Sequence, residues 1–409
     1  MPTFEEARRL ILSRIVPLGE EHVRVTAASG RILSEDVRAP WDLPLCDNSA
    51  MDGYAVRSPD CKGPVTLTIS GYQSAGGPGA PRVDPGCAVK IMTGSPIPEG
   101  CDAVVPFEEA EESGGTVTVR GAVRRRAHIR FRGEDVKAGV LVLPAGTTIR
   151  PPEASMLASF GRTLVPVYRK ARVAVLSTGD ELVEPGAPLA PGKVIDSNSV
   201  SLAAAVEEAG ASPILLGIAP DDRASLRSKI EEGLSADALI TSAGVSAGDR
   251  DFVREVLEEL SVEPVFWRVD IKPGRPTAFG VKDDKPVFSL PGNPVSSLVT
   301  FEMFVRPALL KMMGHPDPVK PTVTAVLADP IRKKAGKVHF HRVTLAVEGG
   351  TYVARTSGDQ NTGILKTLVM ADGIAVLPAE RTDFEAGETV DVCILYASVF
   401  QGGPRENRG

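Results

Sequence analysis

The start of the chain has the pattern of an amphipathic helix. Apolar residues recur there at the spacing that places them on one helical face, namely Ala7, Leu10, Ile11 and Ile15. Thr3 and Glu6 precede this run with the three-residue spacing of a capping box, in which each side chain accepts a hydrogen bond from a free backbone N–H group. The pattern predicts a helix that begins at about residue 4.

A different pattern, of short alternating segments, runs from about Val65 to Val136. VTLTIS, AVKIM, AVVPF and TVTV are separated by clusters of Gly, Pro and Ser, which indicates a small all-β insert. Beyond it lie a strand-like VLVL and a short helical PPEASMLASFG that begins with proline and ends at Gly161. We therefore expect a split domain, built from short segments on both sides of the insert.

Residues from about 172 to 314 alternate between strand-length apolar runs and helical segments. The runs are VAVLS, PILLGIA, DALITS and PVFSL, and the last helical segment is PVSSLVTFEMFVRPALLKMM. Alternation of this kind predicts a parallel sheet with helices on both faces, and right-handed crossovers make it a doubly wound α/β fold. FWRVDI, just before Lys272, is predicted to be a further strand.

The remaining chain predicts a small terminal β domain. VHFHRVTLAVEGGTYVARTSG has the pattern of a hairpin around Gly349-Gly350, and IAVLP and VDVCILY are two more strands. The alternation changes phase between Phe340 and Val343. We interpret this change as a β-bulge near Arg342.

Composition narrows the class of protein. At 409 residues, two to four domains are expected. A net charge of −6 and an aromatic content of 5% argue against nucleic acid or an anionic membrane as the main partner. The first residues contain no apolar signal-peptide core, and no apolar run approaches the ~20 residues needed to span a bilayer. A cytoplasmic location is expected.

Cysteines and histidines offer little metal chemistry. The five cysteines include no C-x-x-C pair and are interpreted as reduced thiols. His339 and His341 alternate on one strand and share a face, so a metal site is conceivable there. Since no third ligand is evident nearby, we favour a pair on the strand surface.

Four loops follow the predicted parallel strands, where an open α/β sheet binds its ligands. Their small residues let backbone N–H groups approach an anion, and helix N-termini add partial positive charge. Neither a P-loop nor a Rossmann glycine motif is present. Contact with a phosphate-bearing ligand is predicted for these loops, which are Thr178–Glu181, Asp221–Asp222, Ser242–Asp249 and Pro291–Ser297.

Acidic residues in these loops would repel a phosphate unless a cation intervened. Mg²⁺ is the simplest choice, because oxygen ligands and phosphate both suit it. We favour ligand roles for Glu181, Asp221 and Asp251, whereas Asp222 and Asp249 are equally well explained as helix N-caps.

Basic residues lie beside the same loops. Lys272 and Arg275 follow FWRVDI, and Arg268 lies on that predicted strand. A solvated strand end is the simpler explanation of this group, but its position beside acidic, glycine-rich loops favours an anion clamp.

Six motifs along the chain resemble those of the MoeA family of molybdopterin molybdenumtransferases, which includes the E domain of gephyrin and plant homologues. The motifs appear in the family's order and span essentially the whole chain. They are DNSAMDGYAV (47–56), IMTGSPIPEGCDAVV (91–105), STGDEL (177–182), TSAGVSAGD (241–249), IKPGRP (271–276) and LPGNPVSS (290–297).

The resemblance implies four domains and a homodimer. The domains would be a split scaffold (1–42 and 137–168), a β insert (43–136), a molybdopterin-binding-like α/β domain (169–315) and a C-terminal β barrel (318–402). The active cleft would lie between the α/β domain of one subunit and the insert of the other.

The implied reaction inserts molybdate into adenylylated molybdopterin and releases AMP. Alternatives are a tungstate-inserting homologue, the molybdopterin adenylyltransferase, which resembles the α/β domain alone, and a gephyrin-like scaffold. That adenylyltransferase could also be a partner. Molybdate would sit among Lys272, Arg275 and Arg342, with no protein nucleophile required.

The resemblance also implies site residues. The catalytic set would be Asp52, Thr93, Glu181, Asp221 and Asp251, the last three also holding the metal. The residues contacting pterin, nucleotide or molybdate would be Gly179, Ser242, Gly244, Gly248, Lys272, Arg275, Pro291, Gly292, Pro294, Ser296, Arg342 and Thr362. Arg268 and Arg275 stand where many members have lysine, and Thr362 replaces a usual serine.

Overall fold

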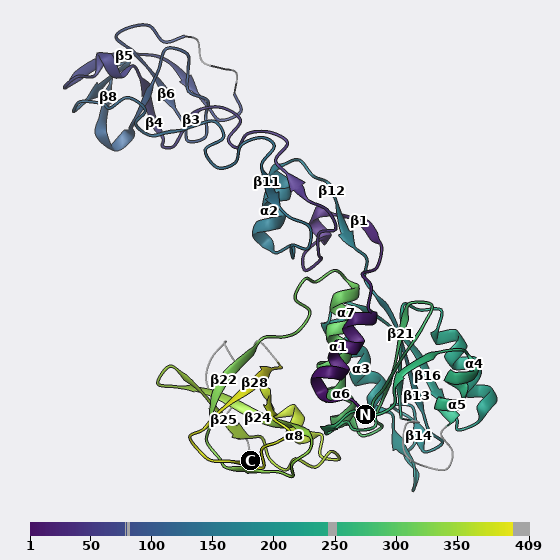
Figure 1. Ribbon diagram of the computed structural model, residues 1–409. Coiled ribbons are helices and arrows are strands. Elements are labelled where there is room, and N and C mark those ends of the chain that lie inside the picture. The colour runs from purple at the N-terminus through teal and green to yellow at the C-terminus, as the bar shows by residue number, and fades with distance from the viewer. Residues whose placement is uncertain (78, 80–81, 244–251, 396–409) are drawn as a thin grey trace. The chain divides into compact units, whose positions relative to one another are not determined.

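The computed structural model describes residues 1–409 apart from 78, 80–81, 244–251 and 396–409. The chain forms two compact units (Figure 1). The first unit comprises Met1–Val23, Ala28–Ser34 and Pro166–Gly409, and the second comprises Arg24–Ala27 and Glu35–Val165. Strands β1 (Glu20–Arg24) and β12 (Leu164–Tyr168) each contain residues of both units.

The second unit is dominated by a six-stranded sheet in the order β7-β4-β6-β5-β9-β8. Its pairs are antiparallel except for β5–β6. A Cβ on Gly53 would lie 2.0 Å from the Val105 carbonyl oxygen. Only glycine at this position therefore lets strands β4 and β7 approach each other so closely. The strands are β4 (Gly53–Val56), β5 (Val65–Gln73), β6 (Cys87–Ile91), β7 (Ala103–Pro106), β8 (Ala110–Ser113) and β9 (Thr116–Val119).

Shorter elements complete this unit. Strand β2 (Val37–Arg38) pairs with β11 (Leu141–Leu143), and β3 (Asn48–Ser49) pairs with β10 (Ile129–Arg130). The predicted short helix is α2 (Pro151–Ser159), which begins with two prolines as expected. Single 3-10 turns are η1 (Val25–Ala27), η2 (Ser58–Asp60) and η3 (Phe107–Glu109).

A doubly wound α/β sheet forms the centre of the first unit, as predicted. Its order is β16-β13-β17-β21-β20-β18, and its first four strands are parallel. Helices α3 (Ser197–Glu208) and α6 (Pro294–Thr300) pack on one face, and α4 (Arg223–Gly233) and α5 (Phe252–Glu259) pack on the other. The strands are β13 (Arg172–Thr178), β16 (Ser212–Ala219), β17 (Ala238–Ser242), β18 (Glu263–Phe266), β20 (Ala278–Lys282) and β21 (Lys285–Leu290), with a small β14 (Leu182–Val183) and β15 (Val194–Ile195) pair outside the sheet.

Two strand predictions in this sheet need correction. The segment AFGVK was not predicted, yet it forms β20, antiparallel to both neighbours. FWRVDI is not one strand, because the backbone leaves the sheet after Phe266. There Val269 donates its N–H to the Arg275 carbonyl and Asp270 donates to the Pro2 carbonyl. Only Ile271–Lys272 is extended again, as β19.

The predicted long helix over 294–313 is also divided. Helix α6 passes into a π-helical turn, Phe301–Val305, and then into α7 (Arg306–Met312). Pro307 has no N–H to donate to the Met303 carbonyl, so a regular α-helical turn cannot form there. A wider turn accommodates this proline.

Five strands close into the terminal β barrel of the first unit. Their order is β24-β25-β22-β28-β26, and β26 pairs back to β24. Strand β19, from the α/β sequence, adds to β24 in parallel. The elements are β22 (Thr322–Leu327), β24 (Val338–Glu348), β25 (Thr351–Thr356), β26 (Gly373–Leu377) and β28 (Thr389–Ile394), with β23 (Ile331–Arg332), β27 (Asp383–Phe384) and α8 (Lys366–Val369) outside the barrel.

No bulge lies near Arg342, so that prediction was wrong. Strand β24 keeps an unbroken register against β26 from His339 to Val343. The burial pattern changes phase because β24 is covered on both faces. Phe340 packs edge-on against Phe4, with ring centroids 5.0 Å apart, whereas Val343 fills the barrel interior.

The first helix, α1 (Phe4–Arg14), has the predicted capping box. Thr3 Oγ1 accepts the Glu6 N–H at 3.3 Å, and Glu6 Oε2 accepts the Thr3 N–H at 2.9 Å. Phe4, Ala7 and Ile11 are buried, and Leu10 is exposed. The helix thus packs on a narrower stripe than the apolar spacing suggested.

Candidate functional site: a basic pocket and the strand-end loops

The first unit contains an open cavity of about 960 Å³. The α/β segment contributes Lys272 and Pro273, and the barrel contributes the rest. The barrel residues that line it include Arg332–Ala335, Lys337, His339, His341 and Asp359–Thr362. The cavity is therefore formed by residues that lie far apart in the sequence.

Lys272 and His339 lie side by side in this pocket. They are register partners in the parallel pair β19–β24. Register partners of a parallel pair project to the same face of a sheet. Their neighbours Ile271 and Val338 are buried in the core on the opposite face. The pairing thereby fixes where Lys272 enters the pocket.

Positive charge dominates the pocket wall. Lys334 and Lys337 have no ion-pair partner among the residues that the structure describes. Lys333 Nζ donates to the carbonyls of Lys337 and Ala379 at 3.2 and 3.3 Å, and burial lowers its pKa. Arg332 is neutralised by Asp383 at 3.1 Å and Glu385 at 2.7 Å. The pocket lining therefore contains four lysines and one carboxylate, that of Asp359.

The two pocket histidines are neutral at pH 7. Burial, with the charges of Lys333, Lys272 and Lys337, lowers the pKa of His339 to about 4. Burial and the nearby Arg342 lower the pKa of His341 to about 4. Within the described chain, no three His, Cys, Asp or Glu side chains are grouped closely enough to hold a metal ion.

Thr362 connects the pocket to the strand-end loops. Asn293 is the N-cap residue of α6, yet its side chain makes no capping hydrogen bond. Its Nδ2 donates instead to Thr362 Oγ1 at 3.1 Å. The predicted LPGNPVSS loop and the barrel loop are thus in direct contact.

A residue that sequence reasoning missed holds two of the strand-end loops together. Asn198 Nδ2 donates to the Gly292 carbonyl at 2.7 Å and to Ser242 Oγ at 2.8 Å. The Ser242 and Asn198 side chains are buried. Only the DSNS sequence, which is the N-cap and first turn of α3, could have indicated this role.

The other predicted members of the PGNPVSS loop surround this contact. Pro291 follows β21 directly, Pro294 is the first residue of α6, and Ser296 is buried in the first turn of that helix. A Cβ on Gly292 would lie 3.1 Å from the Ala243 side chain, so a small residue is needed where the loops after β17 and β21 meet.

Arg342 is completely buried and contacts the loop 359–361, which lines the pocket. Its Nε donates to Thr367 Oγ1 at 2.9 Å, and its Nη2 donates to the carbonyls of Asp359 at 2.9 Å and Asn361 at 3.3 Å. Desolvation lowers the pKa of this guanidinium. Arg342 thus holds the loop that lines the pocket.

Lys272 is followed by a tight turn. Gly274 has φ +103°, and a Cβ there would lie 2.2 Å from Thr300 Cγ2. Arg275 and Arg268 are exposed on either side of this segment. Of the three predicted basic residues, only Lys272 lines the pocket.

The acidic loops after β13 and β16 are joined to each other. Asp180 Oδ1 accepts the Asp221 N–H at 3.0 Å. Gly179 has φ +144°, and a Cβ on it would lie 2.5 Å from a Glu181 carboxylate oxygen, so the carboxylate lies over the glycine. Asp222 caps α4 through the Ser225 N–H at 2.9 Å, as the N-cap explanation predicts. Gly244, Gly248, Asp249 and Asp251 lie outside the described residues.

The second unit brings its two predicted residues together. Asp52 Oδ1 accepts hydrogen bonds from the Thr93 N–H at 2.7 Å and Thr93 Oγ1 at 2.8 Å, which lower the pKa of Asp52. The same loop contacts a segment that sequence analysis did not select, since Ala50 donates to the His128 carbonyl at 2.9 Å and Asn48 pairs with Arg130. His128 has φ +54°, a conformation that only surrounding structure maintains.

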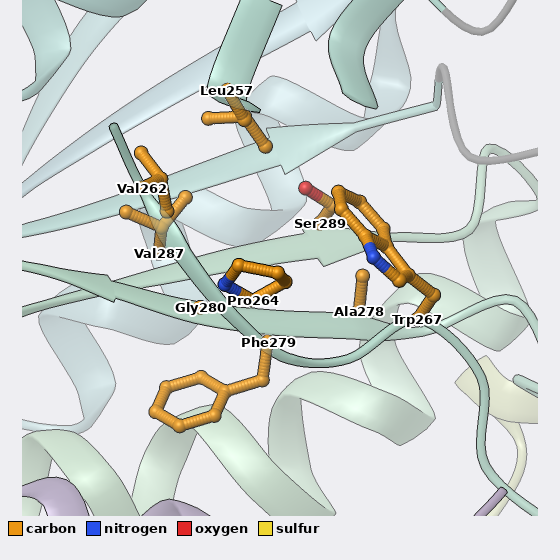
Figure 2. Close-up of a pocket in the computed structure, with 9 residues that line it drawn as sticks. All are labelled: Leu257, Val262, Pro264, Trp267, Ala278, Phe279, Gly280, Val287 and Ser289. Carbon is orange, nitrogen blue, oxygen red and sulfur yellow. The ribbon is translucent and has the colours of Figure 1, made fainter. Parts of the chain in front are cut away.

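A second cavity in the α/β domain is too small to be the site. Figure 2 shows Leu257, Val262 and Trp267 converging over the β20–β21 strands. Its volume is about 10 Å³, which is at most one water molecule. No helix in the described part of the chain is long and apolar enough to cross a membrane.

The fold and the pocket define a multi-domain α/β protein with a basic cavity suited to an anion. Three family profiles match it: the MoeA N-terminal region (domain I and II) over residues 2–161, the probable molybdopterin binding domain over 174–311, and the MoeA C-terminal region (domain IV) over 324–395. The chain belongs to the MoeA family.

Similar proteins support this placement. A molybdopterin molybdenumtransferase of Haemophilus influenzae is 38% identical over 96% of this chain and 98% of its own length. Molybdopterin molybdenumtransferase 2 of Mycobacterium tuberculosis is 38% identical over 96% and 99%. The crystal structure of the molybdopterin biosynthesis MoeA protein of Pyrococcus horikoshii OT3 superimposes with a TM-score of 0.82, at 32% identity, over 97% of this chain and 100% of that one.

Proposed function

We propose that this protein is a molybdopterin molybdenumtransferase, an enzyme that inserts molybdate into adenylylated molybdopterin and releases AMP. Membership of the MoeA family and the names of its relatives support this reaction. One observation carries it: a basic pocket for an oxyanion adjoins the strand-end loops through the Asn293–Thr362 hydrogen bond. The relatives are named for molybdenum, which does not favour tungstate as the substrate.

Molybdate, a tetrahedral dianion, would bind beside Lys272 and Thr362. Lys272 supplies charge, and the Thr362 hydroxyl can donate to an oxygen while it accepts from Asn293. Arg342 acts through the loop 359–361 rather than at the pocket surface. The two pterin sulfurs replace oxygens of molybdate, and water cleaves the pyrophosphate linkage, so no protein nucleophile is needed.

The proposed place for Mg²⁺ is the acidic strand-end loops. Glu181 and Asp221 are exposed and have no Lys or Arg partner in the described chain, so their oxygens are available as hard ligands. We assign them, with Asp251, to the metal. A bound divalent cation would polarise the phosphate linkage and offset its charge.

Several further features belong to this proposal. The four domains would have the bounds 1–42 with 137–168, 43–136, 169–315 and 318–402. The enzyme would act as a cytoplasmic homodimer that receives its substrate from the adenylyltransferase. Asp52 and Thr93, joined by two hydrogen bonds between two exposed loops of the insert, would complete the cleft of the other subunit.

Incubation with adenylylated molybdopterin, molybdate and Mg²⁺ tests the function. AMP together with a molybdenum-loaded pterin is expected. Lys272→Ala should raise the KM for molybdate, whereas Lys366→Ala, an exposed lysine outside the pocket, should not. Formation of adenylylated pterin from ATP would indicate the adenylyltransferase instead, and neither product would indicate a scaffold. Competition with tungstate measures the metal preference.

A further inference from the structure

His339 is free to bind a ligand in the basic pocket. Its imidazole has no hydrogen-bond partner in the described chain, although it lines the cavity directly beside Lys272. His341, two residues along the same face, differs in this respect. Its Nε2 is 3.1 Å from Thr356 Oγ1, which ties that ring to the barrel wall.

The surrounding charge decides which kind of ligand His339 can take. Two histidines on one strand face could bind a cation or an anion. Lys272, Lys333 and Lys337 all act electrostatically on His339. They would repel a metal ion, and no third metal ligand is grouped with the pair in the described chain. The same lysines attract an anion.

A neutral imidazole adds a hydrogen bond that lysine does not replace. It carries one N–H donor of fixed direction and no net charge. This N–H donates to a charged oxygen only at hydrogen-bond distance. It adds little to the long-range electrostatic attraction of an anion. The lysines and His339 therefore have separable effects on an oxyanion.

We propose that His339 is a substrate-binding residue that donates a hydrogen bond to an oxygen of molybdate, next to Lys272. This inference rests on the proposed function and adds a residue to its oxyanion site. Lys334 and Lys337 attract the dianion to the pocket, and His339 orients it there.

Binding of sodium molybdate alone to the full chain, measured by titration calorimetry at several salt concentrations, tests the proposal. His339→Leu keeps the side-chain volume but removes the donor, and it should weaken binding about tenfold at every salt concentration. His339→Gln restores a donor and should stay within about threefold of the parent. His22→Leu, an exposed histidine on β1, is the matched control and should bind normally.

The salt dependence separates hydrogen bonding from charge. Lys337→Ala should reduce the slope of log Kd against log salt, whereas His339→Leu should leave that slope unchanged. Equal weakening in the Leu and Gln variants would assign His339 to packing and overturn the proposal, as would unchanged affinity in His339→Leu. AMP release by the parent protein separates the two claims: its absence removes the proposed function, and its presence with normal molybdate binding by His339→Leu removes only the role of His339.

Discussion

The side-chain amide of Asn293 donates a hydrogen bond to the Thr362 hydroxyl over 3.1 Å, across 69 residues of sequence. It joins the start of α6 to the loop that follows β25. The loop of the doubly wound sheet and the loop of the barrel therefore have to be placed together for the pocket to keep its shape.

Loss of this hydrogen bond should couple the two residues in catalysis. Asn293→Ala is expected to slow AMP release about tenfold, because one anchoring hydrogen bond is lost, and Thr362→Val should slow it further, because the bond from the hydroxyl to molybdate is lost as well. The double variant should be little slower than Thr362→Val alone, since that variant already removes the interaction with Asn293. Thr362→Ser keeps the hydroxyl and should remain close to the parent. Multiplicative losses in the double variant would show that the two residues act independently.

Replacement of Arg342 should loosen the pocket wall. Arg342→Met leaves the buried Thr367 hydroxyl without its donor, at about 1–3 kcal/mol, and also removes the donor to the half-buried carbonyls of Asp359 and Asn361. A fall in Tm of about 5 °C or more is expected, together with a higher KM for molybdate. Arg355→Met, which removes only an exposed pair with Glu348, serves as the control in a thermal melt. An unchanged Tm in Arg342→Met would contradict the supporting role.

Neighbouring aspartates should separate metal binding from helix capping. Asp222→Ala removes the cap on α4 and should cost about 1 kcal/mol of stability, with AMP release retained. Asp221→Asn should leave stability nearly unchanged but raise the Mg²⁺ concentration for half-maximal AMP release about tenfold, as one carboxylate ligand is lost. Identical Mg²⁺ titrations for the parent and Asp221→Asn would exclude Asp221 from the metal site.

The acid stability of the second unit should depend on Glu153. Hydrogen bonds from the Arg150 side chain and backbone lower the pKa of Glu153 from 4.5 to about 2. A folded-state pKa below the unfolded value stabilises the fold above about pH 4.5, and this stabilisation is lost as the pH falls toward 2.

Glu153→Gln should therefore be less stable than the parent at pH 7, with the difference shrinking between pH 5 and pH 3. Urea unfolding followed by Trp41 fluorescence, in a Trp267→Phe background, reports on the second unit. Glu108→Gln, an exposed glutamate in the same unit, is the control. A difference that stays constant with pH would assign the effect of Glu153 to packing.

Local patterns correctly predicted those helices and strands in which the spacing of apolar residues matches the period of the element. The apolar runs gave β13, β16, β17 and β21, and their following loops gave Gly179, Glu181 and Asp221, because a parallel strand ends where its ligand loop begins. The phase change at Arg342 was misinterpreted, since alternation alone cannot distinguish a bulge from a strand covered on both faces.

Other parts of the site depend on pairing between strands that are far apart in the sequence, and no local sequence pattern could predict them. Lys333, Lys334 and Lys337 form an ordinary basic loop in the sequence, and the pairing of β24 with β19 brings Lys272 into the pocket that they line. Asp52, Thr93 and Arg342 were selected through the family resemblance. The structure explains their local contacts, and their part in the reaction stays a prediction.

The two-residue strand β19 has a consequence for how the enzyme assembles. Lys272 belongs to the α/β segment of the sequence, but its strand, β19, pairs with strand β24 of the barrel. A chain cut after residue 315 would keep the strands of the doubly wound sheet but lose β24, the strand whose pairing with β19 positions Lys272. Oxyanion affinity should therefore require the closed barrel as well as the α/β sheet.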